Sequence, residues 1–239
     1  MTRPRHQAAN LGRQIQIRGG IACLCPMLEI VPVESALSPN WWQGYDWLIF
    51  VSANAVRHAV AAGLRSPLSR LAAIGRATAA TMEKNGLQVA CQVPPPYTSE
   101  SLLALPSFQQ VKGCRILIVR GVGGRPKLAT VLKECGAQVS LAELYRRLPP
   151  SPEMVGKLRA CVQKGVDAVL VSSAQVLTNL QQAAGDLAET IHRLPLIVPS
   201  DRVAGIAGKA GFSDVTTAAS AMDSEMLAAL EKRLGKSSK

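Results

Sequence analysis

The chain has 239 residues, a length that suits one large or two small domains. Hydrophobic residues make up 48% of it and aromatic residues only 4%, which predicts cores of Val, Leu, Ile and Ala, as in parallel sheets covered by helices, and argues against a β-sandwich. A net charge of +11 attracts anions and leaves nucleic acid, an anionic membrane surface and a polycarboxylate small molecule as candidate partners.

Signals for several common protein classes are missing from the sequence. No apolar run approaches the length of about 18 residues that spans a bilayer, and there is no signal peptide, so we expect a cytoplasmic protein with no membrane partner. The six cysteines form no C-x-x-C pair and the three histidines have no ligand-like spacing, so we expect core thiols in a reducing compartment, no metal site and no cofactor. No RNP-like aromatic run or zinc finger supports nucleic-acid binding.

Short apolar runs bounded by turn residues alternate with stretches of helical period, which is the βαβ pattern of an α/β protein. Several helical stretches end in glycine, as at Gly19, Gly63 and Gly136, where a C-cap requires positive φ. In chain order the pattern predicts helix 4–18, strand 22–25, strand 47–51, helix 53–62, strand 71–74, helix 78–85, short strand 88–90, helix 99–105, strand 115–119, helix 124–135, short strand 138–141, helix 151–164, strand 168–171, helix 174–183, strand 196–199, helix 202–210, short strand 214–216 and helix 224–234.

The chain contains an internal repeat. Asp46 and Ser52 recur as Asp167 and Ser173, 121 residues later in both cases. Further matches, each at a constant offset, join residues 74–86 to 199–211, 99–105 to 224–230, and 3–19 to 120–136. The repeat predicts two domains of one plan, a split one formed by residues 1–32 plus 148–239 and an inserted one formed by residues 33–147. A cleft between them is a natural ligand site.

Four turns between strands and helices carry the residues expected of an anion site, at 51–54, 74–78, 119–125 and 171–175. Backbone N–H groups and positive helix ends bind carboxylates or phosphates, although Ser, Asn and Thr in such turns are equally explained as helix N-caps. The turn after residue 119 is the sharpest signal. Gly121, Gly123 and Gly124 admit close backbone approach there, and Arg120 and Arg125 offer forks for carboxylates.

Motifs along nearly the whole chain resemble the uroporphyrinogen-III synthase family. They are Thr2-Arg3-Pro4, LEI at 28–30, IFVSANAV at 49–56, AIGRATA at 73–79, LIVRG at 117–121 with GGR at 123–125, and ELYRR at 143–147. Each piece alone is weak, and their combination in this order is specific. The resemblance implies two flavodoxin-like lobes with parallel sheets, joined by a two-stranded linker, with the active site in the cleft between them.

The resemblance also implies one reaction, the dehydrating ring closure of the linear tetrapyrrole hydroxymethylbilane with inversion of ring D, without a metal or an organic cofactor. The absence of a G-x-S-x-G elbow, an H-E-x-x-H motif or a P-loop agrees with a reaction that depends on binding geometry and electrostatics. The substrate is a polycarboxylate, which the positive net charge attracts. We expect a monomer that receives this substrate by transient hand-over from hydroxymethylbilane synthase.

Tyr145 matches the tyrosine that the family places at the cleft, and we expect it to donate a proton to the leaving hydroxyl or to orient it. The alternative is a hinge aromatic whose hydroxyl is satisfied inside the protein. The expected substrate-binding residues come from the turns and their repeats: Arg3, Ser52, Asn54, Gly75, Arg76, Thr78, Arg120, Gly121, Gly123, Gly124, Arg125, Ser172, Ser173, Ser200 and Arg202.

Two features depart from the family pattern. The family begins with an apolar strand before Thr-Arg-Pro, whereas Met1 directly precedes Thr2 here. We expect either that the true start lies upstream or that the split lobe lacks its first strand. Val203 stands where the family commonly has threonine. Two other functions stay open, namely a non-catalytic anion-binding paralogue of the same fold and a nucleic-acid binder that uses the positive charge.

Overall fold

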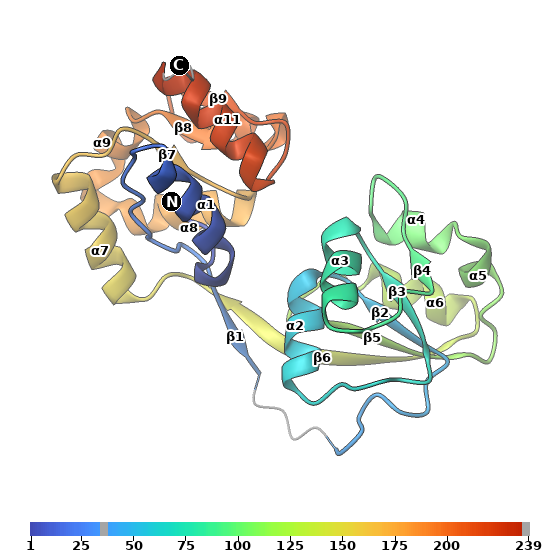
Figure 1. The fold of residues 1–239 in the computed structure, drawn as a ribbon. Helices are drawn as coiled ribbons and strands as arrows, with labels where there is room; N and C mark the ends of the chain where they lie inside the picture. Colours follow the sequence, from blue (N-terminus) through green and yellow to red (C-terminus); the bar gives the residue numbers. More distant parts are fainter. Residues whose placement is uncertain (34–37, 236–239) are drawn as a thin grey trace. The chain divides into compact units, whose positions relative to one another are not determined.

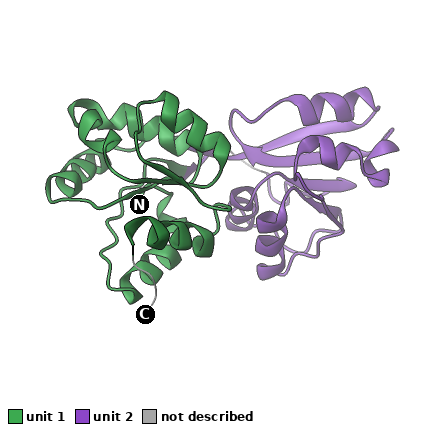
Figure 2. Ribbon diagram, turned by 90° about the horizontal axis from the view of Figure 1, so that it is seen from above, with its two compact units in different colours: residues 1–30, 148–239 green, residues 31–147 purple. Residues whose placement is uncertain are grey.

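Two sheets, each covered by helices, form the framework of the computed structural model, which describes residues 1–33 and 38–235 (Figure 1). The predicted α/β class is confirmed. The chain divides into two compact units, unit 1 with Met1–Ile30 and Leu148–Lys239 and unit 2 with Val31–Arg147 (Figure 2). It passes from one unit to the other within β1 (Glu29–Pro32) and near the end of β6 (Gln138–Leu148), and these two strands are neighbours in one sheet.

Unit 2 is built on a six-stranded sheet in the order β1-β6-β5-β2-β3-β4. Besides β1 and β6 its strands are β2 (Trp47–Phe50), β3 (Arg70–Ala73), β4 (Cys91–Gln92) and β5 (Arg115–Gly121). The pairs from β6 through to β4 are all parallel. β2 is buried at every position, as its continuous apolar run predicts for a parallel strand covered on both faces.

Helices cover both faces of this sheet. They are α2 (Ala53–Ala61), α3 (Arg76–Lys84), α4 (Ser99–Leu103), α5 (Pro106–Gln109) and α6 (Lys127–Glu134). Side chains alternate along a strand, so Ile49 and Ile118 point to the face where Phe108 and Leu132 of the α4–α6 layer complete the core. α2 and α3 pack together on the other face (Figure 1).

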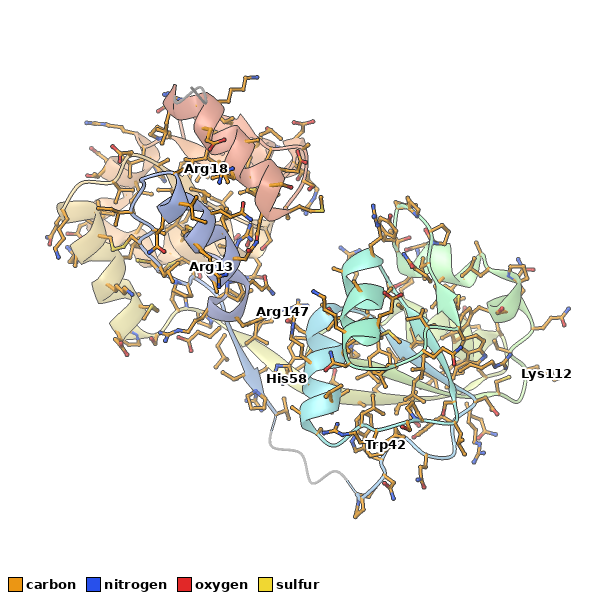
Figure 3. All side chains as sticks on the ribbon, in the orientation of Figure 1. Arg13, Arg18, Trp42, His58, Lys112 and Arg147 are labelled. Atoms are coloured by element: carbon orange, nitrogen blue, oxygen red, sulfur yellow. A yellow bond between two sulfur atoms is a disulfide. The ribbon has the colours of Figure 1, made fainter. Side chains whose placement is uncertain are left out.

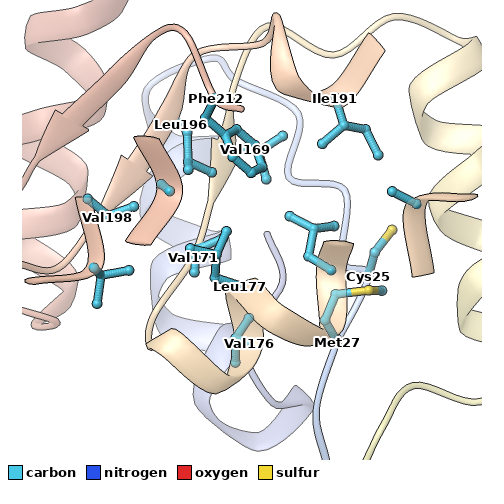
Figure 4. Packing of buried hydrophobic residues seen from close by; sticks show 14 of the residues in the cluster. Cys25, Met27, Val169, Val171, Val176, Leu177, Ile191, Leu196, Val198 and Phe212 are labelled. Atoms are coloured by element: carbon cyan, nitrogen blue, oxygen red, sulfur yellow. The ribbon is translucent and has the colours of Figure 1, made fainter. Parts of the chain in front are cut away.

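Unit 1 has a three-stranded parallel sheet in the order β7-β8-β9. Val169, Leu196 and Val198 face one hydrophobic cluster (Figure 4), and the alternate residues Leu170 and Ile197 face a second one. Helices therefore cover both faces here too. The elements are α1 (Arg5–Ile17), α7 (Pro152–Gln163), β7 (Val169–Leu170), α8 (Ala174–Ala184), a 3-10 turn at Gly185–Leu187, α9 (Ala188–His192), β8 (Leu196–Val198), α10 (Asp201–Lys209), β9 (Val215–Thr217) and α11 (Asp223–Leu234).

The predicted strand at 22–25 is wrong. Residues 22–27 run beside the start of the chain and are joined to it by three hydrogen bonds between main-chain groups. The Met1 amino group donates to the Cys23 carbonyl at 2.8 Å, and the N–H groups of Cys25 and Met27 donate to the Met1 and Thr2 carbonyls, both at 2.9 Å. Thr2 in turn donates to the Leu170 carbonyl at the end of β7. An apolar run becomes a strand only where a neighbour offers a ladder, and this neighbour is too short.

Other differences concern element limits. Arg120 and Gly121, expected in a turn, belong to β5, because β6 runs on to Leu148 and continues the ladder. The strand expected at 88–90 lies at Cys91–Gln92, and the short elements β1, α5 and α9 were not predicted. Among the described residues, every helix is too short or too polar to cross a bilayer.

Candidate functional site

Several candidate residues meet at one edge of the sheet of unit 2. Ser52 follows β2, Gly75 follows β3, and Gly121 ends β5. Because these strands are parallel, their carboxyl ends share an edge, which is where open α/β sheets bind ligands. Tyr145 lies on β6 directly opposite Gly121. The structure thus brings the catalytic candidate together with three of the predicted turns.

Tyr145 is completely buried, and its hydroxyl lies 2.9 Å from Oγ of Ser52. Ser52 is also the N-cap of α2, since its Oγ accepts the N–H of Ala55 at 3.1 Å. The β5–β6 register shifts after Arg120, so that Tyr145 instead of Leu144 stands opposite Gly121. Such irregularities re-aim side chains, and here the shift directs Tyr145 to Ser52.

Gly121 is required for this arrangement by space alone. A Cβ at this position would lie 2.6 Å from a ring carbon of Tyr145, far inside van der Waals contact. The ring therefore packs directly on the backbone of β5.

His58 of α2, labelled in Figure 3, stacks on the Tyr145 ring. The ring centroids are 5.2 Å apart and the ring planes meet at 21°. The guanidinium carbon of Arg147 lies 5.9 Å from the same ring centroid. His58 was not among the predicted site residues. Its contact joins a helix to a strand distant in the chain, and no local pattern signals such a pair.

The side chain of Arg120 donates hydrogen bonds to the backbone of the turn that follows it. The residue is buried, its Nε donates to the Gly121 carbonyl at 3.3 Å, and its Nη1 donates to the Arg125 carbonyl at 3.2 Å. Its Nε also lies 3.5 Å from a carboxylate oxygen of Glu143. A Cβ at Gly124 would overlap the guanidinium. Arg120 therefore serves the protein's own atoms in this conformation.

Other turn residues of unit 2 differ in how far they are available to a ligand. Arg76 and Arg125 are exposed, and their side chains bond to none of the described residues. Gly75 begins α3 at φ +99° without a side-chain cap. Thr78 is buried and donates to the Ile74 carbonyl at 2.8 Å, so its hydroxyl is used internally. Two further candidates lie in the same turns: Asn54, whose Oδ1 accepts from Arg57, and the exposed Gly123.

The corresponding edge of unit 1 carries three serines. Ser173 caps α8 through the N–H of Val176 at 3.3 Å, and the half-buried Ser172 precedes it. Ser200 stands before α10 without a side-chain cap bond, and Arg202 in the first turn of that helix is exposed.

Arg3, another predicted carboxylate ligand, is paired inside unit 1. It is buried, forms an ion pair with Asp223 of α11, and donates to the Ala221 carbonyl at 3.3 Å. Like Arg120, it is occupied by the protein's own carboxylate and carbonyl groups.

An open hollow of about 720 Å³ lies at the opposite edge of the sheet of unit 2. Trp42 and Asp46 line it together with Arg70 and Arg115, which begin β3 and β5. It contains none of the candidate residues. Because ligands of parallel sheets bind at the carboxyl ends, we favour the edge with Ser52 and Tyr145.

The cysteines are less scattered than their sequence positions predicted. The expectation of free core thiols is wrong for Cys23 and Cys161, which are joined by a disulfide, and for the exposed Cys135. Cys25 lies beside the disulfide. Burial raises the pKa of the Cys25 thiol and, in unit 2, that of the Cys91 thiol. Spacing along the chain did not reveal this group, because its members come from segments far apart in sequence.

Comparisons with known proteins point to one family. A model of the family described as uroporphyrinogen-III synthase HemD matches residues 9–228. The uroporphyrinogen-III synthase of Salmonella typhimurium is 29% identical over 248 residues, which cover 97% of this chain and 98% of that protein. A putative uroporphyrinogen-III synthase of Methanothermobacter thermautotrophicus is 31% identical over 78% of this chain and 77% of its own length.

Solved structures agree in fold. The crystal structure of a mutant uroporphyrinogen III synthase from Thermus thermophilus matches with a TM-score of 0.62 at 22% identity, covering 99% of this chain and 100% of that one. A uroporphyrinogen-III synthetase from Helicobacter pylori matches with a TM-score of 0.59 at 16% identity, covering 89% of this chain and 92% of the other. At these identities the likeness concerns the fold alone.

Proposed function

This chain belongs to the uroporphyrinogen-III synthase family, and we propose that it acts as a lyase that closes hydroxymethylbilane into a ring with loss of water and inversion of ring D. The hydrogen bond between Tyr145 and Ser52 carries the mechanistic proposal. Loss of a hydroxyl requires a proton donor held where substrate binds, and this pair lies at the carboxyl edge of a parallel sheet.

The hydrogen bonds of Ser52 leave one proton available. Its Oγ accepts the N–H of Ala55, and we assign the Tyr145 O–H as its second donor, which fills both lone pairs. The O–H of Ser52 is then free to point elsewhere. Ser52 is half-buried and Tyr145 fully buried. Ser52 is therefore the group that reaches the substrate, and Tyr145 supplies the proton from behind it.

The proton balance closes over the whole reaction. When the carbon–oxygen bond of the hydroxymethyl group breaks, its electron pair leaves with oxygen, Ser52 protonates that oxygen, and Tyr145 reprotonates Ser52. Water, an azafulvenium cation and a phenolate result. Ring D attacks the cation through its substituted carbon, and the proton lost when the spiro intermediate rearranges returns to the phenolate.

Positioning is the second requirement, because the free substrate closes spontaneously without inversion. Arg76 and Arg125 are exposed cations at the same edge as Ser52, and the uncapped start of α3 adds backbone donors. We propose that they bind substrate carboxylates. We extend this role to Ser173, Ser200 and Arg202 of unit 1, so that both units bind one tetrapyrrole.

The cellular setting belongs to the proposal as well. We propose a cytoplasmic monomer that takes hydroxymethylbilane from the enzyme that makes it. Size-exclusion chromatography of the full chain tests the monomer, and product yield with and without hydroxymethylbilane synthase in the same reaction tests the hand-over.

Porphyrin isomer analysis tests the function itself. Hydroxymethylbilane incubated with the full chain should yield the type III isomer, whereas buffer alone yields type I. A product that stays type I while the tetrapyrrole binds would identify a non-catalytic anion-binding paralogue. Steep salt-dependent binding to nucleic acid without any effect on the tetrapyrrole would identify a nucleic-acid binder.

Replacement of Tyr145 by Phe tests the proton relay. The ring and its packing on Gly121 are kept, and only the hydroxyl is lost. Turnover should fall by at least about 100-fold, the lower range of general acid catalysis, with tryptophan fluorescence unchanged. Turnover equal to that of the wild type removes Tyr145 from the mechanism.

A further inference from the structure

Three cysteines meet in unit 1 at a point that the proposed reaction does not use. Cys23 and Cys25 lie two residues apart in the extended segment after α1, so their side chains share one side of it. Cys161 lies near the end of α7. Sγ of Cys25 is 3.7 Å from that of Cys23 and 3.6 Å from that of Cys161, and all three sulfur atoms lie within 4.8 Å of one another.

These spacings fit a shared metal ion. A zinc–thiolate bond of about 2.3 Å places two sulfur ligands of one ion about 3.8 Å apart. Both distances from Cys25 come within a few tenths of an ångström of that value. Cys23 and Cys161 are disulfide-bonded here, with Cα atoms 6.7 Å apart, which is near the long end of the range for disulfides. Reduction followed by side-chain rotation is enough to separate their sulfur atoms to the metal spacing.

The surroundings of these three sulfur atoms favour the binding of a soft metal cation over uncoordinated thiolates. Cys25 is buried, whereas Cys23 and Cys161 are half-buried and give access from solvent (Figure 4 shows Cys25 at the margin of the core). Burial raises the pKa of the Cys25 thiol, and the charges of the Met1 amino terminus and of Lys157 oppose this only in part. A bound metal ion displaces the proton from such a thiol, so burial does not prevent ligation.

We propose that Cys23, Cys25 and Cys161, once reduced, bind a closed-shell thiophilic cation such as Zn²⁺ through three thiolates. Electrons and protons balance in both steps. A thiol or phosphine reductant supplies two electrons, and with two protons it converts the disulfide to two thiols. The cation then forms three metal–sulfur bonds and releases three protons, and water fills a fourth position. The disulfide and the metal are alternative states of one site.

Such an ion would tie residues 23–25 to α7 in a part of unit 1 where backbone bonds are few. Three hydrogen bonds between main-chain groups join the extended segment to the start of the chain. A ligand that binds only the folded state stabilises it by mass action. The expected consequence is a higher unfolding temperature of unit 1 in the presence of Zn²⁺.

Cadmium titration of the full chain tests the site. The protein is reduced with a phosphine, freed of metal under anaerobic conditions and titrated with Cd²⁺, whose thiolate complexes absorb in the ultraviolet. The charge-transfer band should saturate at one ion per chain, and Zn²⁺ should compete it away. Cys25→Ser should weaken Cd²⁺ binding by at least about 100-fold, more than loss of an outer-shell partner does.

Cys135→Ser is the matched control, because it removes an exposed thiol of unit 2 and leaves the same number of cysteines as Cys25→Ser. It should bind Cd²⁺ as the wild type does. Equal loss in both variants, or no band in the reduced wild type, overturns the proposal. If Cys25→Ser does not fold, alkylation of the wild type with and without Zn²⁺ decides instead. Protection of Cys23, Cys25 and Cys161 but not of Cys135 supports the site, and uniform labelling refutes it.

Discussion

The two units follow one plan but differ in their sheets. In unit 2 the seven-residue strand β5 pairs with β2 on one side and with β6 on the other. At the repeat offset of 117, the last residues of β5 correspond to Met1–Pro4. In the described part of unit 1, this stretch bonds to β7 only through Thr2, whose N–H donates to the Leu170 carbonyl. Among the described residues, the sheet of unit 1 has three strands and the sheet of unit 2 has six. The cysteine group of unit 1 lies beside this short stretch.

The same comparison shows which residues near the two capping serines differ between the units. Ser52 corresponds to Ser173, and both cap a helix at the same place in the plan. Tyr145, however, corresponds at the offset of 117 to Leu28, and His58 corresponds at the offset of 121 to Asn179, which donates to the Met27 carbonyl at 2.7 Å. Among the described residues, the capping serine Ser52 has a tyrosine hydroxyl at hydrogen-bonding distance, whereas the capping serine Ser173 has none. The duplicated scaffold is shared, and the proposed proton donor is not.

The intrinsic fluorophores allow the two units to be followed separately. All tryptophan and tyrosine residues lie in unit 2, namely Trp41, Trp42, Tyr45, Trp47, Tyr97 and Tyr145. Intrinsic fluorescence therefore reports on unit 2, whereas far-ultraviolet circular dichroism reports on the helices of both units.

The largest effect is expected from Gly121→Ala. The new methyl group overlaps the Tyr145 ring, so the hydroxyl moves away from Ser52 and turnover should fall by about 100-fold or more. Overpacking should also destabilise unit 2 by about 1–3 kcal/mol. Gly156→Ala in α7 of unit 1 is the control, since open space surrounds it, and it should stabilise unit 1 by up to about 1 kcal/mol. Equal activity of the two variants would contradict the packing argument.

The buried arginines should affect stability, each in its own unit. Arg3→Leu leaves the Asp223 carboxylate without its charged partner, although Asn10 still donates to it, and should lower the free energy of unfolding of unit 1 by about 2 kcal/mol. Arg120→Leu should do the same in unit 2. In urea, Arg120→Leu should shift the fluorescence midpoint and Arg3→Leu only the dichroism. A fluorescence shift of equal size in both variants argues against separate units.

His58→Asn places in unit 2 the residue that unit 1 has at the repeated position. The stack on Tyr145 is lost, and aromatic pairs contribute about 0.5–1.5 kcal/mol, so we expect turnover to fall by about threefold to tenfold. Steady-state kinetics measures this, with His6→Asn of the first turns of α1 as the control. A variant as active as the wild type would show that the stack does not position the ring.

The smallest effects concern surface ion pairs at low pH. In unit 1 a hydrogen bond from Arg233 lowers the pKa of Asp214 below its ordinary value of 3.8. In unit 2 a hydrogen bond from Lys127 lowers the pKa of Glu100 to about 2. Each pair stabilises the fold above the ordinary pKa, and this contribution is lost as pH falls through the lowered value. Both midpoints in urea should decrease slightly from about pH 4 downward. Asp214→Asn should reduce the acid sensitivity of unit 1, and an unchanged sensitivity would exclude that pair.

Periodicity predicted the elements that lie in long, regular segments. α2, α8 and the parallel strands were found within a few residues, because their apolar spacing and capping serines are local signals. The strand at 22–25 failed because strand formation depends on a neighbour. β6 was longer than predicted because its second half pairs with β1 and β5 and is only partly apolar.

The candidate site could be predicted from the sequence only in part, because some of its contacts depend on neighbouring segments that are distant in the chain. The turn residues and Tyr145 could be named from motifs, since parallel strands place their carboxyl ends together. The stack of His58 on Tyr145, the inward turn of Arg3 and Arg120, and the meeting of Cys23 with Cys161 are contacts between distant segments. They depend on packing, which the residue pattern does not encode locally.

The central claim, that one plan is used twice but the proton donor lies in unit 2, is tested most directly by kinetics of Ser52→Ala and Ser173→Ala with hydroxymethylbilane. Both variants lose the same helix cap. Ser52→Ala should lower kcat by at least about 100-fold with little change in KM, and Ser173→Ala should raise KM with kcat nearly unchanged. An equal fall of kcat in both variants, or a larger one in Ser173→Ala, would contradict the account.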